Sequence, residues 1–100
     1  MTSMTVNDKQ TKYLRGLAHD LKPVVMIGNK GLTEAVTDEI DVALEHHELI
    51  KIRISGQERA DRKATVDAIA AQTDSYIVHV IGHIAALYRP SKKALIQLPK

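Results

Sequence analysis

The chain of 100 residues is 44% hydrophobic and 26% charged, and its formal net charge is +2. This length suits one domain, and this composition is that of an ordinary globular protein rather than a disordered chain, a collagen or a coiled coil. The absence of cysteine excludes disulfides, thiol catalysis and the usual structural zinc sites. No apolar run approaches the ~20 residues of a membrane span, and residues 1–6 lack a signal-peptide pattern, so we expect a cytoplasmic protein.

Charge is distributed unevenly along the chain. Residues 33–48 contain six of the twelve acidic residues and none of the fourteen Lys and Arg, so the net charge is −6 in this segment and +8 in the rest of the chain. We therefore expect an acidic face and a basic face, and a basic face can bind a polyanion although the total charge is small. Ordinary solvated helix surfaces are the alternative explanation of the same distribution.

The N-terminal part of the chain predicts a flexible lead followed by a helix. Residues 1–6 have no periodic pattern, so we expect the folded domain to comprise residues 7–100. Asn7 can cap a helix that runs to about Ala18, because apolar residues recur on one side at helical spacing. The basic residues of this helix are Lys9, Lys12 and Arg15.

Two strand patterns flank a second predicted helix. The apolar run PVVMIG, which starts at Pro23, predicts a strand buried on both faces. Thr33 is the expected N-cap of a helix that runs to about His46. The run LIKIRIS then alternates between apolar and polar residues, which predicts a strand with one buried face. Its apolar face comprises Ile50, Ile52 and Ile54, and its polar face comprises Lys51 and Arg53. The alternation alone leaves open whether a helix edge covers the polar face or solvent reaches it.

The last part of the chain predicts a third helix and a β-hairpin. Residues 58–73 have helical spacing. The residues expected in register on the packed side of this helix are Ala60, Ala64, Ala68, Ile69 and Gln72. The β-rich segments YIVHVIG and IAALYR meet at Gly82, where we expect a hairpin turn. Pro90 ends the second segment, and ALIQLP is either an edge strand or an extended tail.

The predicted order of helices and strands is therefore αβαβαββ. Strands separated by single helices need crossover connections, whereas the terminal hairpin adds an antiparallel pair. We predict a single compact domain of the α/β or α+β class, with a mixed four-stranded sheet packed with helices.

The loop GNKG, residues 28–31, joins the first predicted strand to the second helix. Glycines permit positive φ and close approach of a ligand, and the backbone N–H groups at the start of a helix can bind phosphate. Lys30 would add a positive charge at the tip. The spacing matches neither a P-loop nor G-x-G-x-x-G, but KH-type modules clamp a nucleic-acid backbone with a G-x-x-G loop. A tight turn that needs glycine only for steric reasons is the alternative.

The stretch LRGLAHDLKPVVMIGNKGLTEAVTDEIDVALEHHELIKIRI, residues 14–54, closely resembles the CRM domain (chloroplast RNA splicing and ribosome maturation), in particular its stand-alone bacterial YhbY-like form. VIG at 80–82 and LYRP at 87–90 agree, so the resemblance covers nearly the whole chain. It implies an RNA-binding domain related in fold to the C-terminal domain of bacterial translation initiation factor three. For the stand-alone bacterial members it also implies association with precursors of the large ribosomal subunit and a role in its assembly.

The resemblance and the charge pattern together give a set of expected RNA-binding residues. The loop and its continuation are Gly28, Asn29, Lys30, Gly31 and Thr33. The basic positions nearest to the loop in the family pattern are Lys22 and Arg15. The surrounding basic field is completed by Lys12, Lys51 and Arg53. Because the chain has only three aromatic residues, we expect contacts to phosphates and to RNA shape rather than to stacked bases.

The sequence offers little support for an enzyme, a metal or a cofactor. His46 and His47 would point about 100° apart on a helix and cannot chelate together. His79 and His83 have no acidic residue close by, and no nucleophile motif is present. We expect a monomer that binds ribosomal RNA and pre-large-subunit particles, with ribosomal proteins as further partners. The alternative is a protein-interaction module that docks through its acidic second helix.

Overall fold

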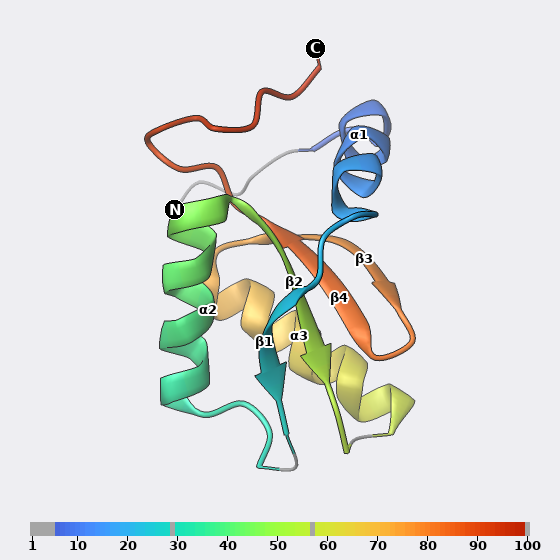
Figure 1. Ribbon diagram of the computed structural model, residues 1–100. Coiled ribbons are helices and arrows are strands. Elements are labelled where there is room, and N and C mark those ends of the chain that lie inside the picture. Colours follow the sequence, from blue (N-terminus) through green and yellow to red (C-terminus); the bar gives the residue numbers. More distant parts are fainter. Residues whose placement is uncertain (1–5, 29, 57, 100) are drawn as a thin grey trace.

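Three helices and four strands follow one another in the described part of the chain. The computed structural model describes residues 6–28, 30–56 and 58–99. Its elements are α1 (Asp8–Ala18), β1 (Pro23–Ile27), α2 (Glu34–His47), β2 (Leu49–Ile54), α3 (Arg59–Thr73), β3 (Tyr76–Ile81) and β4 (Ile84–Tyr88). The order αβαβαββ confirms the prediction, and Figure 1 shows the strands in one sheet with the helices around it.

The strands form a mixed four-stranded sheet, as predicted, and their order in the sheet is β1-β2-β4-β3. β1 and β2 are parallel because α2 crosses over between them, whereas β4 is antiparallel to both of its neighbours. The β3–β4 hairpin turns at Gly82, whose φ of 59° suits glycine. The carboxyl ends of β1 and β2 and the hairpin turn consequently lie at the same end of the sheet.

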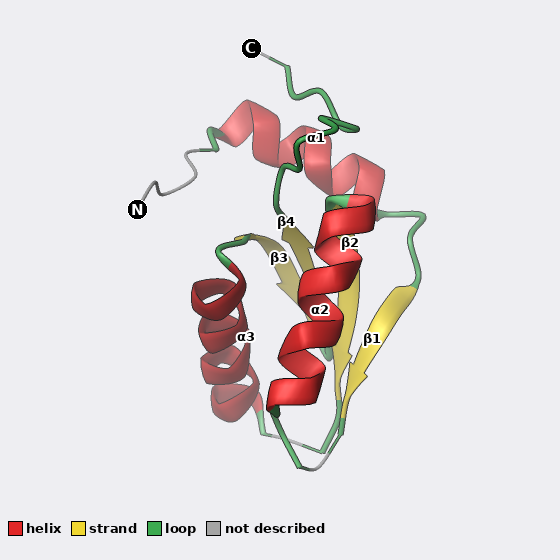
Figure 2. Cartoon of the chain, turned by 90° about the vertical axis from the view of Figure 1, so that its left-hand side faces the viewer, coloured by secondary structure: helices red, strands yellow, loops and turns green. Residues whose placement is uncertain are grey.

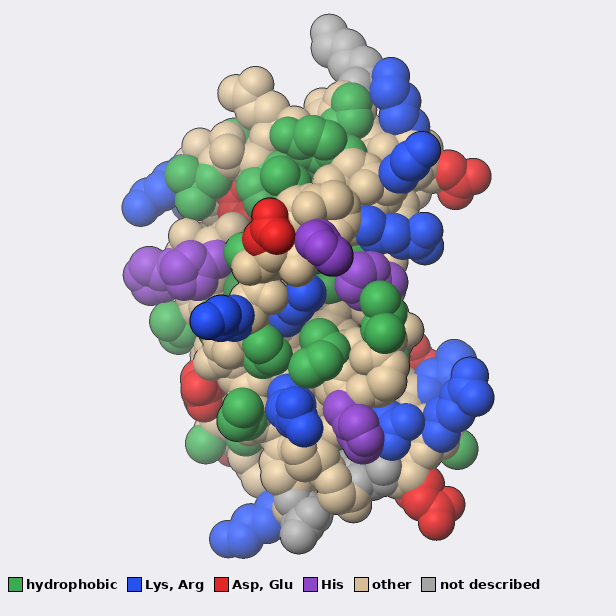
Figure 3. All heavy atoms as spheres, turned by 45° about the vertical axis from the view of Figure 1, so that its right-hand side comes forward, with side chains coloured by type: hydrophobic (Ala, Val, Ile, Leu, Met, Phe, Trp, Pro, Cys, Tyr) green, Lys and Arg blue, Asp and Glu red, His purple; other side chains and the backbone are tan. Residues whose placement is uncertain are grey.

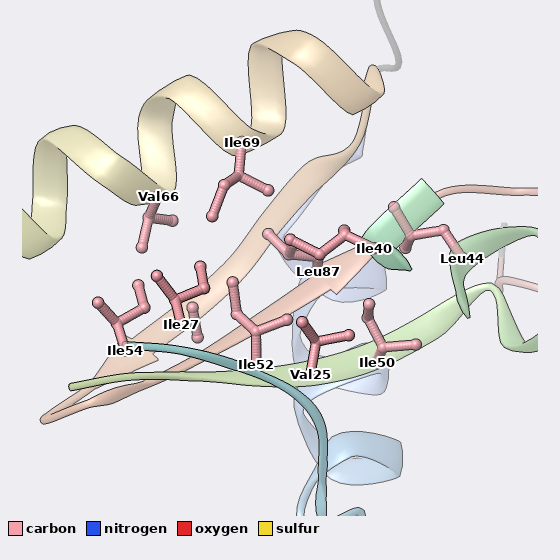
Figure 4. Close-up of a cluster of buried hydrophobic side chains, with 11 residues drawn as sticks. Val25, Ile27, Ile40, Leu44, Ile50, Ile52, Ile54, Val66, Ile69 and Leu87 are labelled. Carbon is pink, nitrogen blue, oxygen red and sulfur yellow. The ribbon is translucent and has the colours of Figure 1, made fainter. Parts of the chain in front are cut away.

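The main hydrophobic core lies between one face of the sheet and the helices α2 and α3, which lie side by side on that face (Figure 2). The alternation predicted for β2 is confirmed, since its three isoleucines point into this core (Figure 4). The other core residues are Val25, Ile27, Ile40, Leu44, Val66, Ile69, Ala85 and Leu87.

A second, smaller cluster lies on the opposite face of the sheet, under α1. Its buried residues are Leu14, Ala18, Leu49, Val78, Ala86 and Tyr88, with Val6, Tyr76, Ile96 and Leu98 packed against them. α1 covers only the upper end of this face in Figure 1, so the lower end is left open. The C-terminal segment packs as an extended tail, and its described residues form no strand.

Two expectations about burial are wrong. β1 is an edge strand with one exposed face, because Val24 is 49% and Met26 is 67% exposed, so it is not buried on both faces. The packed side of α3 consists of Val66, Ile69 and Thr73, so of the expected residues Ile69 is buried and Ala68 half-buried, whereas Ala60, Ala64 and Gln72 are exposed. Alanine is tolerated on either side of a helix, so it indicates the packed side poorly. The prediction relied on three alanines and therefore placed the packed side of α3 wrongly.

A buried carboxylate holds the C-terminal tail. Glu48, between α2 and β2, is fully buried and has a φ of 64°. Its side chain accepts hydrogen bonds from the backbone N–H groups of Ser91, Leu95 and Ile96 at 3.0, 2.9 and 2.8 Å, and from the Ser91 hydroxyl. Burial would raise the pKa of Glu48, but these hydrogen bonds outweigh it and hold the pKa below its ordinary value.

Two acids of α2 have a structural partner after β4. The Arg89 guanidinium donates to the carboxylates of Asp41 at 2.6 Å and Glu45 at 3.2 Å, and to the carbonyl oxygen of Thr73 at 2.9 Å. This arginine joins α2 to the end of α3. Part of the acidic charge of α2 therefore serves the fold.

Candidate nucleic-acid interface

The loop between β1 and α2 is a tight turn with an exposed lysine at its tip. The Gly31 N–H donates to the Gly28 carbonyl oxygen at 3.0 Å, which closes the turn, and Lys30 is exposed. Gly31 has a φ of 73°, a backbone conformation that L side chains adopt only with strain. Asn29, the remaining residue of the expected loop, lies outside the described residues.

The two glycines differ in what the fold requires of them. The positive φ of Gly31 is a steric reason for glycine. Gly28 has no such φ, and a Cβ placed on it would have no heavy atom within 4 Å. The purely steric explanation of the G-x-x-G spacing therefore covers Gly31 but not Gly28, and the open space over Gly28 leaves its backbone accessible to a ligand.

Thr33 has the predicted capping role. Its hydroxyl accepts a hydrogen bond from the Val36 N–H at 3.2 Å, in an extended conformation before α2 begins. Asn7 likewise accepts from the Gln10 N–H at 2.8 Å, so both predicted N-caps are confirmed. The cap uses the exposed Thr33 hydroxyl only as an acceptor, so its O–H group can still donate to a ligand beside Lys30.

Two rows of residues lie on the α1 side of the sheet: the first borders the cluster under α1, in which Ala86 is buried, and the second is open. Strand register places Lys51, Ala86 and His79 in one row across β2, β4 and β3. The next row comprises Met26, Arg53, Ile84 and Ile81. Arg53 is exposed and Lys51 is partly exposed, so solvent reaches the polar face of β2. Figure 3 shows the basic, histidine and hydrophobic side chains that gather on this side of the molecule.

Arg15 of α1 and Lys51 of β2 both act on the electrostatic surroundings of His79. Burial lowers the pKa of the His79 imidazole, and the positive charges of Arg15 and Lys51 lower it further. The Lys51 ammonium also reaches the His19 carbonyl oxygen at the end of α1, at 3.4 Å. Arg15 and Lys51, 36 residues apart in sequence, therefore contribute to one positive region.

Lys22 and Arg15 do not lie next to the G-x-x-G loop. Lys22 precedes β1 and the loop follows it, and a five-residue strand separates its ends by about 17 Å. Lys22 lines an apolar pocket of about 500 Å³ formed with Leu17, Leu21 and other side chains beside the start of β1. Lys12 is exposed on α1, at the same end of the molecule. The expected basic field is thus an extended band from α1 across the same side of the sheet, with Lys30 at the far end of β1.

Sequence reasoning missed three further basic residues and the buried Glu48. Arg59, Arg62 and Lys63 have the i, i+3, i+4 spacing of one helix face, a signal that was available in the sequence. For Glu48 no sequence signal separates it from the solvated acids of α2, because its hydrogen-bond donors lie more than 40 residues away.

The described residues contain no group of three or more His, Cys, Asp or Glu side chains that could hold a metal ion. Over the same part of the chain, none of the helices is long and apolar enough to cross a membrane.

The fold and the basic band define an α+β domain with a surface suited to a polyanion. The CRS1 / YhbY (CRM) domain model matches residues 6–89, and the chain belongs to this family. An RNA-binding protein of Haemophilus influenzae is 51% identical over 96 residues, which cover 96% of this chain and 97% of that protein. A probable RNA-binding protein of Pseudomonas aeruginosa is 41% identical, over 90% of this chain and 86% of that protein.

A solved structure agrees with the fold. The solution structure of the hypothetical protein SAV1595 from Staphylococcus aureus, a protein proposed to bind RNA, superposes with a TM-score of 0.83 at 38% identity. The match covers 95% of this chain and all of that one. The α+β class and the mixed sheet predicted from the sequence are thereby confirmed.

Proposed function

We propose that this protein binds structured ribosomal RNA in the cytoplasm and assists assembly of the large ribosomal subunit. The observation that carries the RNA contact is the G-x-x-G turn, where Gly28 has open space over its backbone and Lys30 is exposed. Relatives named as RNA-binding proteins support the class of ligand. The ribosomal target rests on the resemblance to the stand-alone bacterial form of the family.

The chemistry of the surface favours contacts to the RNA backbone. Lys30 and the backbone N–H groups at the start of α2 would hold one phosphate, while Lys51 and Arg53 on β2 and Arg15 on α1 would meet others. The apolar residues beside these cations, such as Met26 and Ile81, are exposed and would pack against riboses. Binding of this kind reads RNA shape more than base sequence.

The loop is tested by Lys30→Ala, with Lys92→Ala as the control because Lys92 is also exposed but lies in the C-terminal tail. Affinity for transcribed large-subunit ribosomal RNA is measured over a range of salt concentrations. Losing one phosphate contact should weaken binding by about 1 kcal/mol, or roughly fivefold. The slope of log K against log salt should change by about 1 for Lys30→Ala only.

Equal affinities and slopes for the two variants would contradict the loop contact. Cross-linking in cells followed by sequencing of the attached RNA tests the ribosomal target. Recovery of no ribosomal RNA would instead favour docking of the acidic α2 on a basic protein.

A further inference from the structure

A second basic cleft lies beside the loop end of the sheet, between the start of α3 and the β3–β4 hairpin. It has a volume of about 740 Å³ and is lined by Arg59, Ala60, Arg62, Lys63, Val80 and Gly82. None of these six described residues is acidic. We propose that this cleft is a second RNA-binding site, which takes the phosphate backbone of a strand that continues from the G-x-x-G loop; this inference rests on the proposed function.

The position of the cleft supports continuity with the loop. The Ser55 N–H donates to the Ile27 carbonyl oxygen at 2.8 Å, which joins the start of the β2–α3 connection to the end of β1. The Ile54 N–H donates to the His83 carbonyl oxygen at 2.8 Å and joins the hairpin turn to the end of β2. The G-x-x-G turn, the start of α3 and the hairpin turn therefore lie at one end of the sheet, and a bound strand can pass from the first to the cleft.

The lining of the cleft has the chemistry of a site for a sugar-phosphate backbone. Arg59 and Lys63 are exposed on one face of α3, where a polyanion can reach them. Across the cleft, Val80 is 47% exposed and offers an apolar surface for ribose. A Cβ on Gly82 would meet no heavy atom within 4 Å, so the hairpin backbone is open to close approach.

The ion pair of Lys63 with Asp67 does not neutralise Lys63. The Lys63 ammonium lies 3.4 Å from the Asp67 carboxylate, and these side chains are 80% and 56% exposed. An exposed pair of this type is weak and screened by salt, so Lys63 can exchange Asp67 for a phosphate at little cost. An acidic protein segment could meet the same cations, but the apolar surface and open glycine favour the RNA backbone, with its alternating riboses and phosphates.

The experiment compares Arg59→Gln/Lys63→Gln with Lys92→Gln/Lys93→Gln, which removes two positive charges from the C-terminal tail instead. Binding to transcribed large-subunit ribosomal RNA should weaken about 20-fold in the cleft variant, and its salt slope should fall by about 1.5, as expected for two lost phosphate contacts. A third variant, Ala60→Glu, adds a carboxylate to the cleft in the first turn of α3, where an acid favours the helix. It should weaken RNA binding without lowering the melting temperature.

The outcomes separate this inference from the proposed function. If the cleft variant matches its control while Lys30→Ala still weakens binding, the cleft is not an RNA site and the loop contact stands. If RNA binding is unchanged but binding to polyglutamate falls in the cleft variant, an acidic protein is the partner and the RNA assignment is overturned. If the wild-type protein does not bind RNA at all, the proposed function itself fails.

Discussion

Replacing Glu48 by Gln tests whether one buried carboxylate holds the C-terminal tail and, through it, α1. The carboxylate receives four hydrogen bonds from residues 91–96. Hydrogen bonds to a charged group contribute about 1.5–3 kcal/mol, against about 1 kcal/mol for neutral groups, and an amide also replaces one acceptor by a donor. Relief of the buried charge offsets part of this loss. We therefore expect the free energy of unfolding at pH 7 to fall by about 2–3 kcal/mol, and the melting temperature by roughly 10–20 °C.

Urea denaturation between pH 7 and pH 3 measures the effect and its origin. Because the pKa of Glu48 is lowered in the fold, its contribution is fully present above the unfolded-state pKa of about 4.3 and is lost as the pH falls through the folded-state pKa. The stabilities of wild type and Glu48→Gln should therefore converge in acid. Equal stability at pH 7, or a constant difference down to pH 3, would refute the reasoning.

The same variant has a consequence for binding. Ile96 and Leu98 of the tail pack against the cluster under α1, and the Gln10 side chain on α1 donates to the Pro99 carbonyl oxygen at 2.9 Å. Release of the tail should loosen α1 and weaken RNA binding by less than the loss of Lys30 does, since only the α1 end of the basic band is affected.

Three further predictions concern the core, the turn and His79. Ile52→Asp places a charge in the main core, where Ile52 is fully buried, and should lower the free energy of unfolding by more than about 4 kcal/mol. A cooperative melt at the wild-type temperature would show that the register of β2 is wrong. Gly31→Ala should lower the free energy of unfolding by about 1 kcal/mol because Gly31 has a positive φ. Gly28→Ala should change the free energy of unfolding by less than about 0.5 kcal/mol but should weaken RNA binding. Unchanged RNA binding by Gly28→Ala would argue against close approach of RNA to the Gly28 backbone. A phosphate bound near His79 should raise the lowered pKa of this imidazole. The RNA affinity of the wild type should therefore increase between pH 7.5 and pH 5.5 by more than the RNA affinity of His79→Gln does. Equal increases in the two proteins would show that the RNA phosphates bind elsewhere.

Local patterns predicted the elements well, because helix and strand formation depends on residues a few positions apart. The caps at Asn7 and Thr33, the alternation in β2 and the hairpin turn at Gly82 all follow from local chemistry. The continuous apolar run of β1 predicts a strand buried on both faces, and this is wrong because such a run does not indicate whether a second layer covers the strand. Val24 and Met26 are exposed because α1 covers only part of that face of the sheet.

The candidate site could be predicted only in part, because most of its residues come from different helices and strands. The loop residues are contiguous, so the sequence by itself placed Gly28, Lys30 and Gly31 in one turn. The tertiary structure decided that Arg15 and Lys51 share one positive region, and that Lys22 lies at the far end of β1 from the loop. It also decided that Glu48 is a buried acceptor for the tail rather than a solvated acid. Such relations depend on strand register and on which face each helix covers, and these are set by contacts between residues far apart in the chain.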